Sequence, residues 1–207
     1  MLSAARYLWD RLSGPRTRAD ELLRLRRRLA EAADPNASAT ERRLARQLCQ
    51  LRQSLGTQIG EVQACRGCVR PHSERWPGGH CCSGHTEDLF TDHELATLRL
   101  SGTSPHQLRP PRSEHAGCAF RGPTGCSLDT AHRPNLCVSY TCRELRSELD
   151  QRGDGAAIAR LQQRIQVTFA RFVATMQERL EAERFEELED SLRRLGTGRH
   201  RRASATL

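Results

Sequence analysis

Apolar residues recur every three or four positions in three long stretches of this chain, which is the spacing of one face of an α-helix. The stretches cover residues 3–31, 40–63 and 155–194, and Gly14-Pro15 is expected to interrupt the first. Their apolar positions are Leu8, Leu12, Leu22, Leu25 and Leu29; then Leu44, Leu48, Leu51, Leu55, Ile59 and Val62; then Ile158, Leu161, Ile165, Phe169, Phe172, Met176, Leu180, Leu188 and Leu192.

The turn-forming run ADPNASAT, residues 33–40, separates the first two stretches, and Ser38 or Thr40 can cap the second helix. We therefore predict an N-terminal helical hairpin over residues 1–63 and a long C-terminal helix over 151–195. Residues 196–207 are basic and are predicted to form a disordered tail.

The middle of the chain, residues 64–150, is rich in Cys, His, Gly and Pro. Thr91 and Glu94 have the spacing of a capping box, which predicts a short helix over 91–102. A small β-hairpin is expected over 118–128, around Gly-Pro-Thr-Gly. Pro134 suits the first turn of a short helix carrying Cys137 and Cys142. The predicted fold class is mainly α, with the two terminal helical units flanking a small cysteine-rich module.

The composition of the chain suggests that its middle segment needs an additional source of stability. Only 4% of the 207 residues are aromatic, so the segment needs support beyond an ordinary core, such as a metal ion. The chain has a net charge of +8, and its positive excess lies outside residues 65–150, where arginines and acidic residues balance. Basic flanks would offset the negative charge of metal-bound thiolates, although nucleic-acid binding is the rival interpretation.

The sequence predicts a cytoplasmic protein without a membrane partner. Residues 1–16 contain Arg6 and Asp10, so they lack the apolar run of a signal peptide. No stretch approaches 18 apolar residues. In a reducing compartment, densely spaced cysteines are more often metal ligands or catalytic residues than disulfides.

Eight of the nine cysteines lie between residues 65 and 142, whereas Cys49 lies on a predicted helix and is expected to be a core residue. The sequence CRGC at 65–68 places two thiols at the spacing of a metal-chelating turn. The candidate metal ligands are Cys65, Cys68, Cys81, Cys82, Cys118, Cys126, Cys137 and Cys142, with His80 and His85 as further candidates.

Three other interpretations of the cysteines are disfavoured. Disulfides need an oxidising compartment, and a thioredoxin-like Cys-x-x-Cys needs a βαβ context, whereas helices are expected before this one. A Cys82 nucleophile beside His80 or His85 leaves seven cysteines unexplained. Arg133 is predicted to stand behind the ligands and to donate hydrogen bonds to thiolates or nearby carbonyls.

The order of these motifs resembles the YkgJ-like cysteine-cluster family, also described by the pattern CxxCxxCC and regarded as zinc- or iron-chelating. The matching parts are Cys65 and Cys68, Cys81-Cys82, Cys118-Ala-Phe120, Gly125-Cys126, Arg133-Pro134, and Cys137 with Cys142. Twelve residues separate Cys68 from Cys81, where the family has only a few. Because the family includes proteins resembling flagellin lysine methylases, the resemblance implies that a protein-modification activity is conceivable.

Eight thiolates suit two four-coordinate zinc sites, or one iron–sulfur cluster with further ligands. We prefer zinc, in a structural or accessory role, over an enzyme. The alternatives are an iron–sulfur redox or modification enzyme and a nucleic-acid-binding zinc adaptor that uses the arginines of RLRRRL, residues 24–29. An unidentified protein partner could bind the terminal helices.

Overall fold

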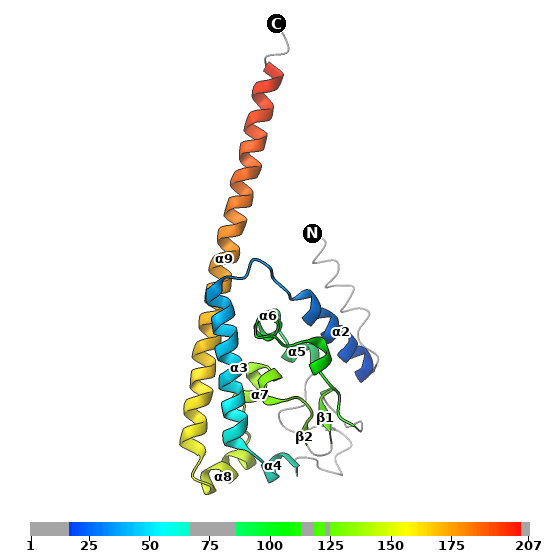
Figure 1. Ribbon diagram of the computed structural model, residues 1–207, viewed down its shortest axis with the longest axis vertical. Helices are drawn as coiled ribbons and strands as arrows, with labels where there is room; N and C mark the ends of the chain where they lie inside the picture. The colour runs from blue at the N-terminus through cyan, green and yellow to red at the C-terminus, as the bar shows by residue number, and fades with distance from the viewer. Residues whose placement is uncertain (1–16, 67–85, 113–117, 123–124, 204–207) are drawn as a thin grey trace.

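The computed structural model describes residues 17–66, 86–112, 118–122 and 125–203, and these are mainly helical (Figure 1). The elements are α2 (Arg18–Glu31), α3 (Ala39–Ile59), α4 (Gln63–Arg66), α5 (Thr86–Leu89), α6 (Asp92–Leu100), η1 (Pro105–Gln107), β1 (Arg121–Gly122), β2 (Gly125–Cys126), η2 (Thr130–His132), α7 (Asn135–Ser139), α8 (Arg143–Gln151) and α9 (Gly155–Ala203). The predicted fold class is confirmed, including the long C-terminal helix and the small antiparallel sheet.

The two longest helices, α3 and α9, pack along each other in opposite directions (Figure 1). Their leucines, isoleucines and phenylalanine interdigitate because the apolar positions repeat at helical spacing on both. We call this group the α3–α9 cluster, and its buried members are Leu44, Ala45, Leu48, Leu51, Leu55, Ala96, Val138, Leu145, Leu149, Ile158, Ile165 and Phe172.

A second hydrophobic group lies beside the first and joins α2 to the middle of the chain. Phe90 and Phe120 stack at a tilt within it, with ring centroids 5.9 Å apart. We call it the α2–α6 cluster, and its buried members are Leu22, Leu25, Leu29, Phe90, Leu95, Leu98, Leu108, Cys118, Phe120 and Leu128. Helix α6 touches both α2 and α3, so it connects the two clusters.

The arrangement of α2 and α3 differs from a simple two-helix hairpin. The main contacts of α2 are with α5, α6 and η1, whereas α3 packs against α9, α6 and η2. The reason is that the leucine face of α2 is covered by middle-segment residues such as Leu98 and Phe120. The helices at 18–31 and 39–59 are nevertheless where the apolar spacing predicts them, while residues 3–16 lie outside the described part of the chain.

A buried ion pair ties α3 to α6. Arg52 donates to Glu94 at 2.8 Å, and the two side chains are only 1% and 5% exposed. The other oxygen of the Glu94 carboxylate accepts the Asn135 N–H at 2.6 Å, at the start of α7. Of the two bonds of the predicted capping box, the first is present, because Thr91 Oγ1 accepts from Glu94 N. The Glu94 carboxylate faces the core and accepts from Arg52 and Asn135.

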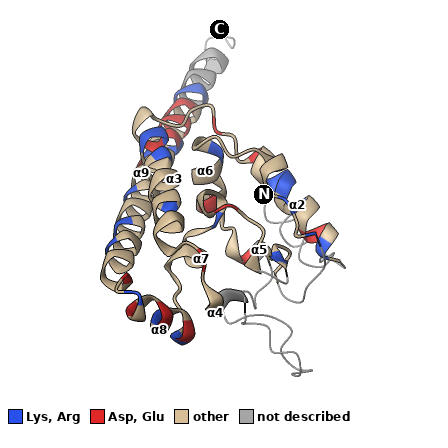
Figure 2. Cartoon of the chain, turned by 60° about the horizontal axis from the view of Figure 1, so that its bottom comes forward, with Lys and Arg blue, Asp and Glu red and all other residues tan. Residues whose placement is uncertain are grey.

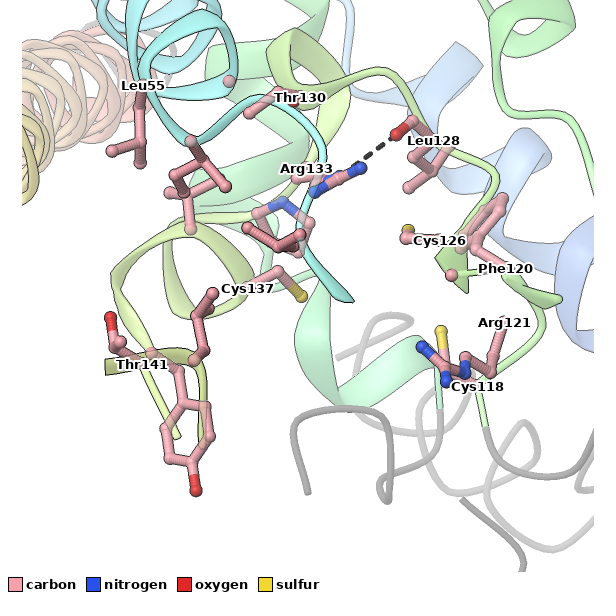
Figure 3. A pocket seen from close by; sticks show the side chains of 18 of the residues that line it. Leu55, Cys118, Phe120, Arg121, Cys126, Leu128, Thr130, Arg133, Cys137 and Thr141 are labelled. Carbon is pink, nitrogen blue, oxygen red and sulfur yellow. Dashed lines mark hydrogen bonds between the residues drawn. The ribbon is translucent and has the colours of Figure 1, made fainter. Parts of the chain in front are cut away.

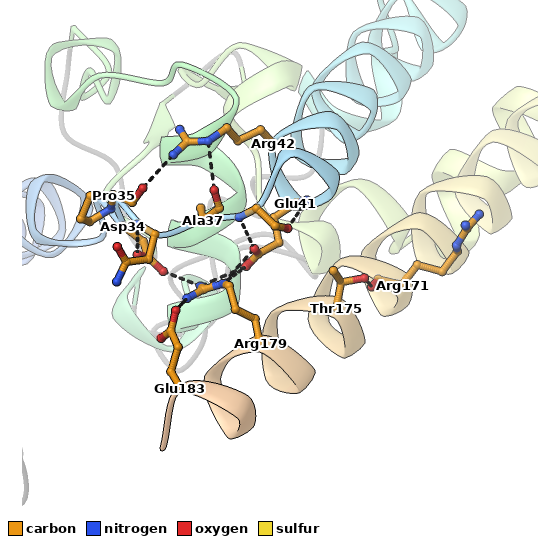
Figure 4. A network of polar contacts seen from close by, with 11 residues as sticks. Asp34, Pro35, Ala37, Glu41, Arg42, Arg171, Thr175, Arg179 and Glu183 are labelled. Carbon is orange, nitrogen blue, oxygen red and sulfur yellow. Dashed lines mark hydrogen bonds and ion pairs between the residues drawn. The ribbon is translucent and has the colours of Figure 1, made fainter. Parts of the chain in front are cut away.

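A second polar network fixes α9 against the connection between α2 and α3 (Figure 4). Ser38 caps α3, and Glu41 completes the capping box by accepting from Ser38 N at 2.6 Å. Arg179 of α9 donates to both oxygens of Glu41, to Asp34 and to Glu183. Burial opposes ionisation of Glu41, but the bonds from Arg179 and Ser38 outweigh it and hold its pKa below the usual value.

Two predicted boundaries are corrected by the structure. Helix α9 continues to Ala203, through most of the segment expected to be a disordered tail. Cys137 and Cys142 do not share one helix: α7 ends at Ser139, and Cys142 is the N-terminal cap of α8. Among the described helices, none has a stretch long and apolar enough to cross a membrane.

Candidate metal centre

A cavity of about 280 Å³ opens where the two hydrophobic clusters meet, and three cysteines line it (Figure 3). Cys126 lies on β2, Cys118 lies in the turn just before β1, and Cys137 lies on α7. The surrounding wall is formed by the C-terminal end of α3, by η2 and by residues of α7 and α8. Cysteines that are up to 19 positions apart in the sequence therefore face one space.

The hairpin holds the first two cysteines close together. Its strands pair Arg121 with Cys126 and Gly122 with Gly125. Gly125 has a φ of 124°, a conformation that glycine adopts without the steric cost of a side chain, so the chain can turn tightly here. Arg121 N donates to Cys118 O at 2.9 Å, which folds Cys118 back beside the strands.

Cys118 is the most deeply enclosed of these thiols, with 7% of its surface exposed. Burial raises its pKa, the hydrogen bonds from Phe120 N–H and Thr86 oppose this, and the nearby Cys126 raises it further. Without a ligand the Cys118 thiol is therefore protonated at neutral pH. A cation that replaced the proton would remove the cost of burying a thiolate.

Cys137 is positioned by the first turn of α7. Pro134 precedes this turn and supplies the carbonyl that accepts from Cys137 N at 3.0 Å. The Asn135 N–H is satisfied by Glu94, so the start of α7 is anchored in the core. Pro134 marks the helix start as the sequence predicts, one residue before the first helical position.

Cys142 lies at the edge of this arrangement. Its sulfur accepts the Leu145 N–H at 3.4 Å, at the N-terminus of α8. It is not among the cavity-lining residues, although its neighbours Thr141 and Leu145 are. A helix N-terminus favours the thiolate form, so the position suits an anionic ligand.

Glutamine 162 of α9 fixes the turn between Cys137 and Cys142, a role that the sequence did not indicate. Its amide nitrogen donates to Val138 O at 3.1 Å, Ser139 O at 3.2 Å and Thr141 Oγ1 at 2.9 Å. Gln162 also lines the cavity. The long helix thus supports the cysteine-rich segment directly.

Helix α8 holds the start of the Cys-x-x-Cys motif in the same way. Glu148 accepts the N–H groups of Gln63 at 3.0 Å and Ala64 at 2.8 Å, at the N-terminus of α4. These two backbone bonds lower the pKa of Glu148. Arg152, one turn later, donates to Ile59 O at 2.9 Å at the C-terminal end of α3. The α3–α4 junction is therefore fixed to the helix that begins at Cys142.

The remaining candidate ligands lie outside the described residues. This applies to Cys68, Cys81, Cys82, His80 and His85, while Cys65 is placed in α4 without a described side chain. The described residues on both sides of this segment border the cavity: Glu61 and Val62 line it, and Thr86 contacts the Cys118 sulfur at 3.8 Å.

Two arginines bring positive charge to the cavity wall. Arg133 donates to Leu128 O at 3.0 Å, a nearby carbonyl, and it lines the cavity together with Arg121, which is 3% exposed. Within the described part of the chain, no three Cys, His, Asp or Glu side chains are close enough together to hold a metal ion. The thiols described here would therefore need further ligands to form a closed site.

The arginine-rich run of α2 is partly used for folding. Arg26 donates twice to Leu108 O, at 3.1 and 2.8 Å. Arg28 donates to Phe90 O at 3.0 Å and to Asp92 at 2.9 Å. These bonds attach α2 to the middle segment, so the cationic run has a structural explanation independent of nucleic acid.

No family model, curated protein or solved structure matches this chain.

Proposed function

We propose that this protein binds metal through its cysteine cluster, with zinc as the preferred ion and a structural or accessory role. The observation that carries the proposal is the cavity shared by Cys118, Cys126 and Cys137. Their thiols come from three places in the fold, namely the turn before β1, strand β2 and helix α7, and backbone bonds hold each of these in position. The described residues at both ends of the segment that carries Cys68, Cys81 and Cys82 border the same cavity.

The chemistry of these donors fits the proposal. Zinc is commonly held by four thiolates or by thiolates with imidazole, and structural sites of this kind are closed. Arg121 and Arg133 would offset part of the charge that four thiolates bring together. We assign the ligand set to Cys65, Cys68, Cys81, Cys82, Cys118, Cys126, Cys137 and Cys142, with His80 and His85 as replacements for a thiol.

Zinc is preferred over an iron–sulfur cluster because a redox-inert structural ion explains how an aromatic-poor segment folds. Apparent binding free energies of structural zinc are about 10 kcal/mol or more at neutral pH, which is comparable to the stability of a whole domain. An iron–sulfur cluster would instead direct attention to redox or modification chemistry.

The test is metal analysis of the full chain, purified without oxygen, together with single cysteine variants. We expect a colourless protein with one or two zinc ions per chain, and reduced zinc content in Cys126→Ser and Cys137→Ser. Cys49→Ser is the matched control, because Cys49 lies on α3 and is not among the cavity-lining residues. A brown protein containing iron and sulfide would show that the bound group is an iron–sulfur cluster instead of zinc. A folded protein without metal would overturn the proposal.

A further inference from the structure

The C-terminal part of α9 extends beyond the rest of the molecule (Figure 1). Arg179 pairs with Asp34 and Glu41, near the N-terminal end of α3, and residues 184–194 are all exposed. From residue 184 to Ala203 the helix is about 30 Å long at 1.5 Å per residue. A helix of this length is marginal in water unless another surface covers its apolar face.

An apolar stripe runs along this projecting segment. Phe185 is 70% exposed, Leu188 is 58% exposed and Leu192 is 60% exposed. Their spacing of three and then four residues is that of successive a and d positions in a coiled coil, and Leu195 continues it in the sequence. The stripe is on the side of α9 opposite Phe172 and Ile165, since successive residues turn by 100°.

Charge changes sign along the same segment. Residues 183–190 contain five acidic residues and one arginine, for a net charge of −4, whereas residues 191–203 contain five arginines and no acidic residue. Figure 2 shows the acidic turns in red where α9 leaves the rest of the molecule. Two such helices side by side in parallel would place acid against acid and arginine against arginine. In the antiparallel arrangement, each acidic half faces an arginine half.

The apolar stripe gives the register of this antiparallel arrangement. If Leu188 of one chain packs against Leu192 of the other, Phe185 falls opposite Leu195. We propose that the projecting end of α9 is a self-association surface, which pairs with a second copy of this chain as a short antiparallel coiled coil.

The seam is short, and Gly196 and Gly198 weaken its outer end. The dimer should therefore be weak and depend on protein concentration rather than be obligate. The attraction between the acidic half of one helix and the arginine half of the other is weaker at high ionic strength, so dissociation should increase with salt.

Analytical ultracentrifugation of the full chain, with reductant present to prevent disulfides, tests the proposal. We expect a concentration-dependent dimer that is lost in Leu188→Asp/Leu192→Asp. Val167→Asp is the control, because Val167 is also exposed on α9, at 48%, but lies 18 residues before Phe185, outside the projecting segment. All three proteins should keep the same urea midpoint for unfolding of the rest of the chain, and any loss of helical signal in Leu188→Asp/Leu192→Asp should be limited to the length of the projecting segment.

Charge exchange tests the orientation. Glu186→Arg/Glu187→Arg changes the net charge of residues 183–190 from −4 to 0, so the antiparallel dimer should weaken and its dissociation should depend less on salt. Stronger association of Glu186→Arg/Glu187→Arg would indicate parallel helices and overturn the antiparallel register. A monomer at every concentration, or a dimer that survives Leu188→Asp/Leu192→Asp, would overturn self-association through this surface.

Discussion

Replacing Arg179 by methionine removes the charge that joins α9 to the α2–α3 connection while retaining most of the aliphatic side chain. Arg179 is 14% exposed, and its main partner Glu41 is 1% exposed. In Arg179→Met the Glu41 carboxylate stays buried with Ser38 as its remaining hydrogen-bond donor, through the Ser38 N–H at 2.6 Å. Removing one partner of a buried ion pair costs about 3–5 kcal/mol. Because Ser38 compensates part of this, we expect a loss of about 2–4 kcal/mol.

The assay is urea unfolding at neutral pH, followed by far-ultraviolet circular dichroism on the full chain. For a protein of this size the expected loss corresponds to a decrease in Tm of roughly 4 to 16 °C. Arg193→Met is the matched control on the same helix, since Arg193 is 74% exposed and pairs with Glu189 at 3.2 Å. Exposed pairs of this kind contribute about 0.3–0.5 kcal/mol.

The pH dependence gives a second, independent readout of the same network. The folded-state pKa of Glu41 is depressed, so its contribution to stability is present above about pH 4.3, the usual carboxyl value, and is lost as the pH falls through the folded-state value. The difference between wild type and Arg179→Met should therefore shrink below about pH 4. Equal stabilities of Arg179→Met and Arg193→Met at neutral pH would refute the reasoning.

Three further substitutions test the packing and the support of the site. Gly56→Ala places a Cβ 2.7 Å from Thr130 Cβ and should cost about 1–3 kcal/mol in urea unfolding, with a smaller cost in a Thr130→Gly background; an unchanged cost there would contradict the close contact. Glu94→Ala leaves the Arg52 guanidinium and the Asn135 N–H buried without their acceptor, so it should lower the free energy of unfolding by about 3 kcal/mol in the same assay. An unchanged free energy of unfolding would show that these bonds do not contribute. Glu148→Gln weakens the bonds that hold α4, which carries Cys65, so it should lower zinc affinity several-fold in competition with a chromophoric chelator while Tm stays nearly unchanged. Unaltered zinc affinity would show that α4 does not contribute to the metal site.

Helical periodicity predicted the long helices because each has an apolar face that is buried against another element. Leu44, Leu48 and Leu55 recur at helical spacing and are all buried in the α3–α9 cluster. The hairpin at 118–128 was also predictable, because Gly and Pro between two short apolar runs are a turn signal. What periodicity cannot give is the partner of each face. The leucines of α2 would fit against α3 equally well, and the structure covers them with α6 and the hairpin instead.

The sequence identified the cysteines as candidate metal ligands, but it did not identify the residues that hold their segments in position. Glu148 and Gln162 act on backbone groups more than 20 residues away in the sequence, and such contacts leave no local pattern. The end of α7 before Cys142 was missed for a related reason. The Val-Ser-Tyr-Thr spacer is compatible with a helix, and it is the bonds from Gln162 to the carbonyls of Val138 and Ser139 that stabilise the turn.

The most direct test of the cysteine-cluster account is X-ray absorption spectroscopy at the zinc and iron edges, on the full chain purified without oxygen. The account predicts zinc surrounded by sulfur at about 2.3 Å, with fewer sulfur neighbours or less zinc in Cys137→Ser and no change in Cys49→Ser. Zinc with only nitrogen and oxygen neighbours, or no bound metal in a protein that keeps its helical content, would contradict it.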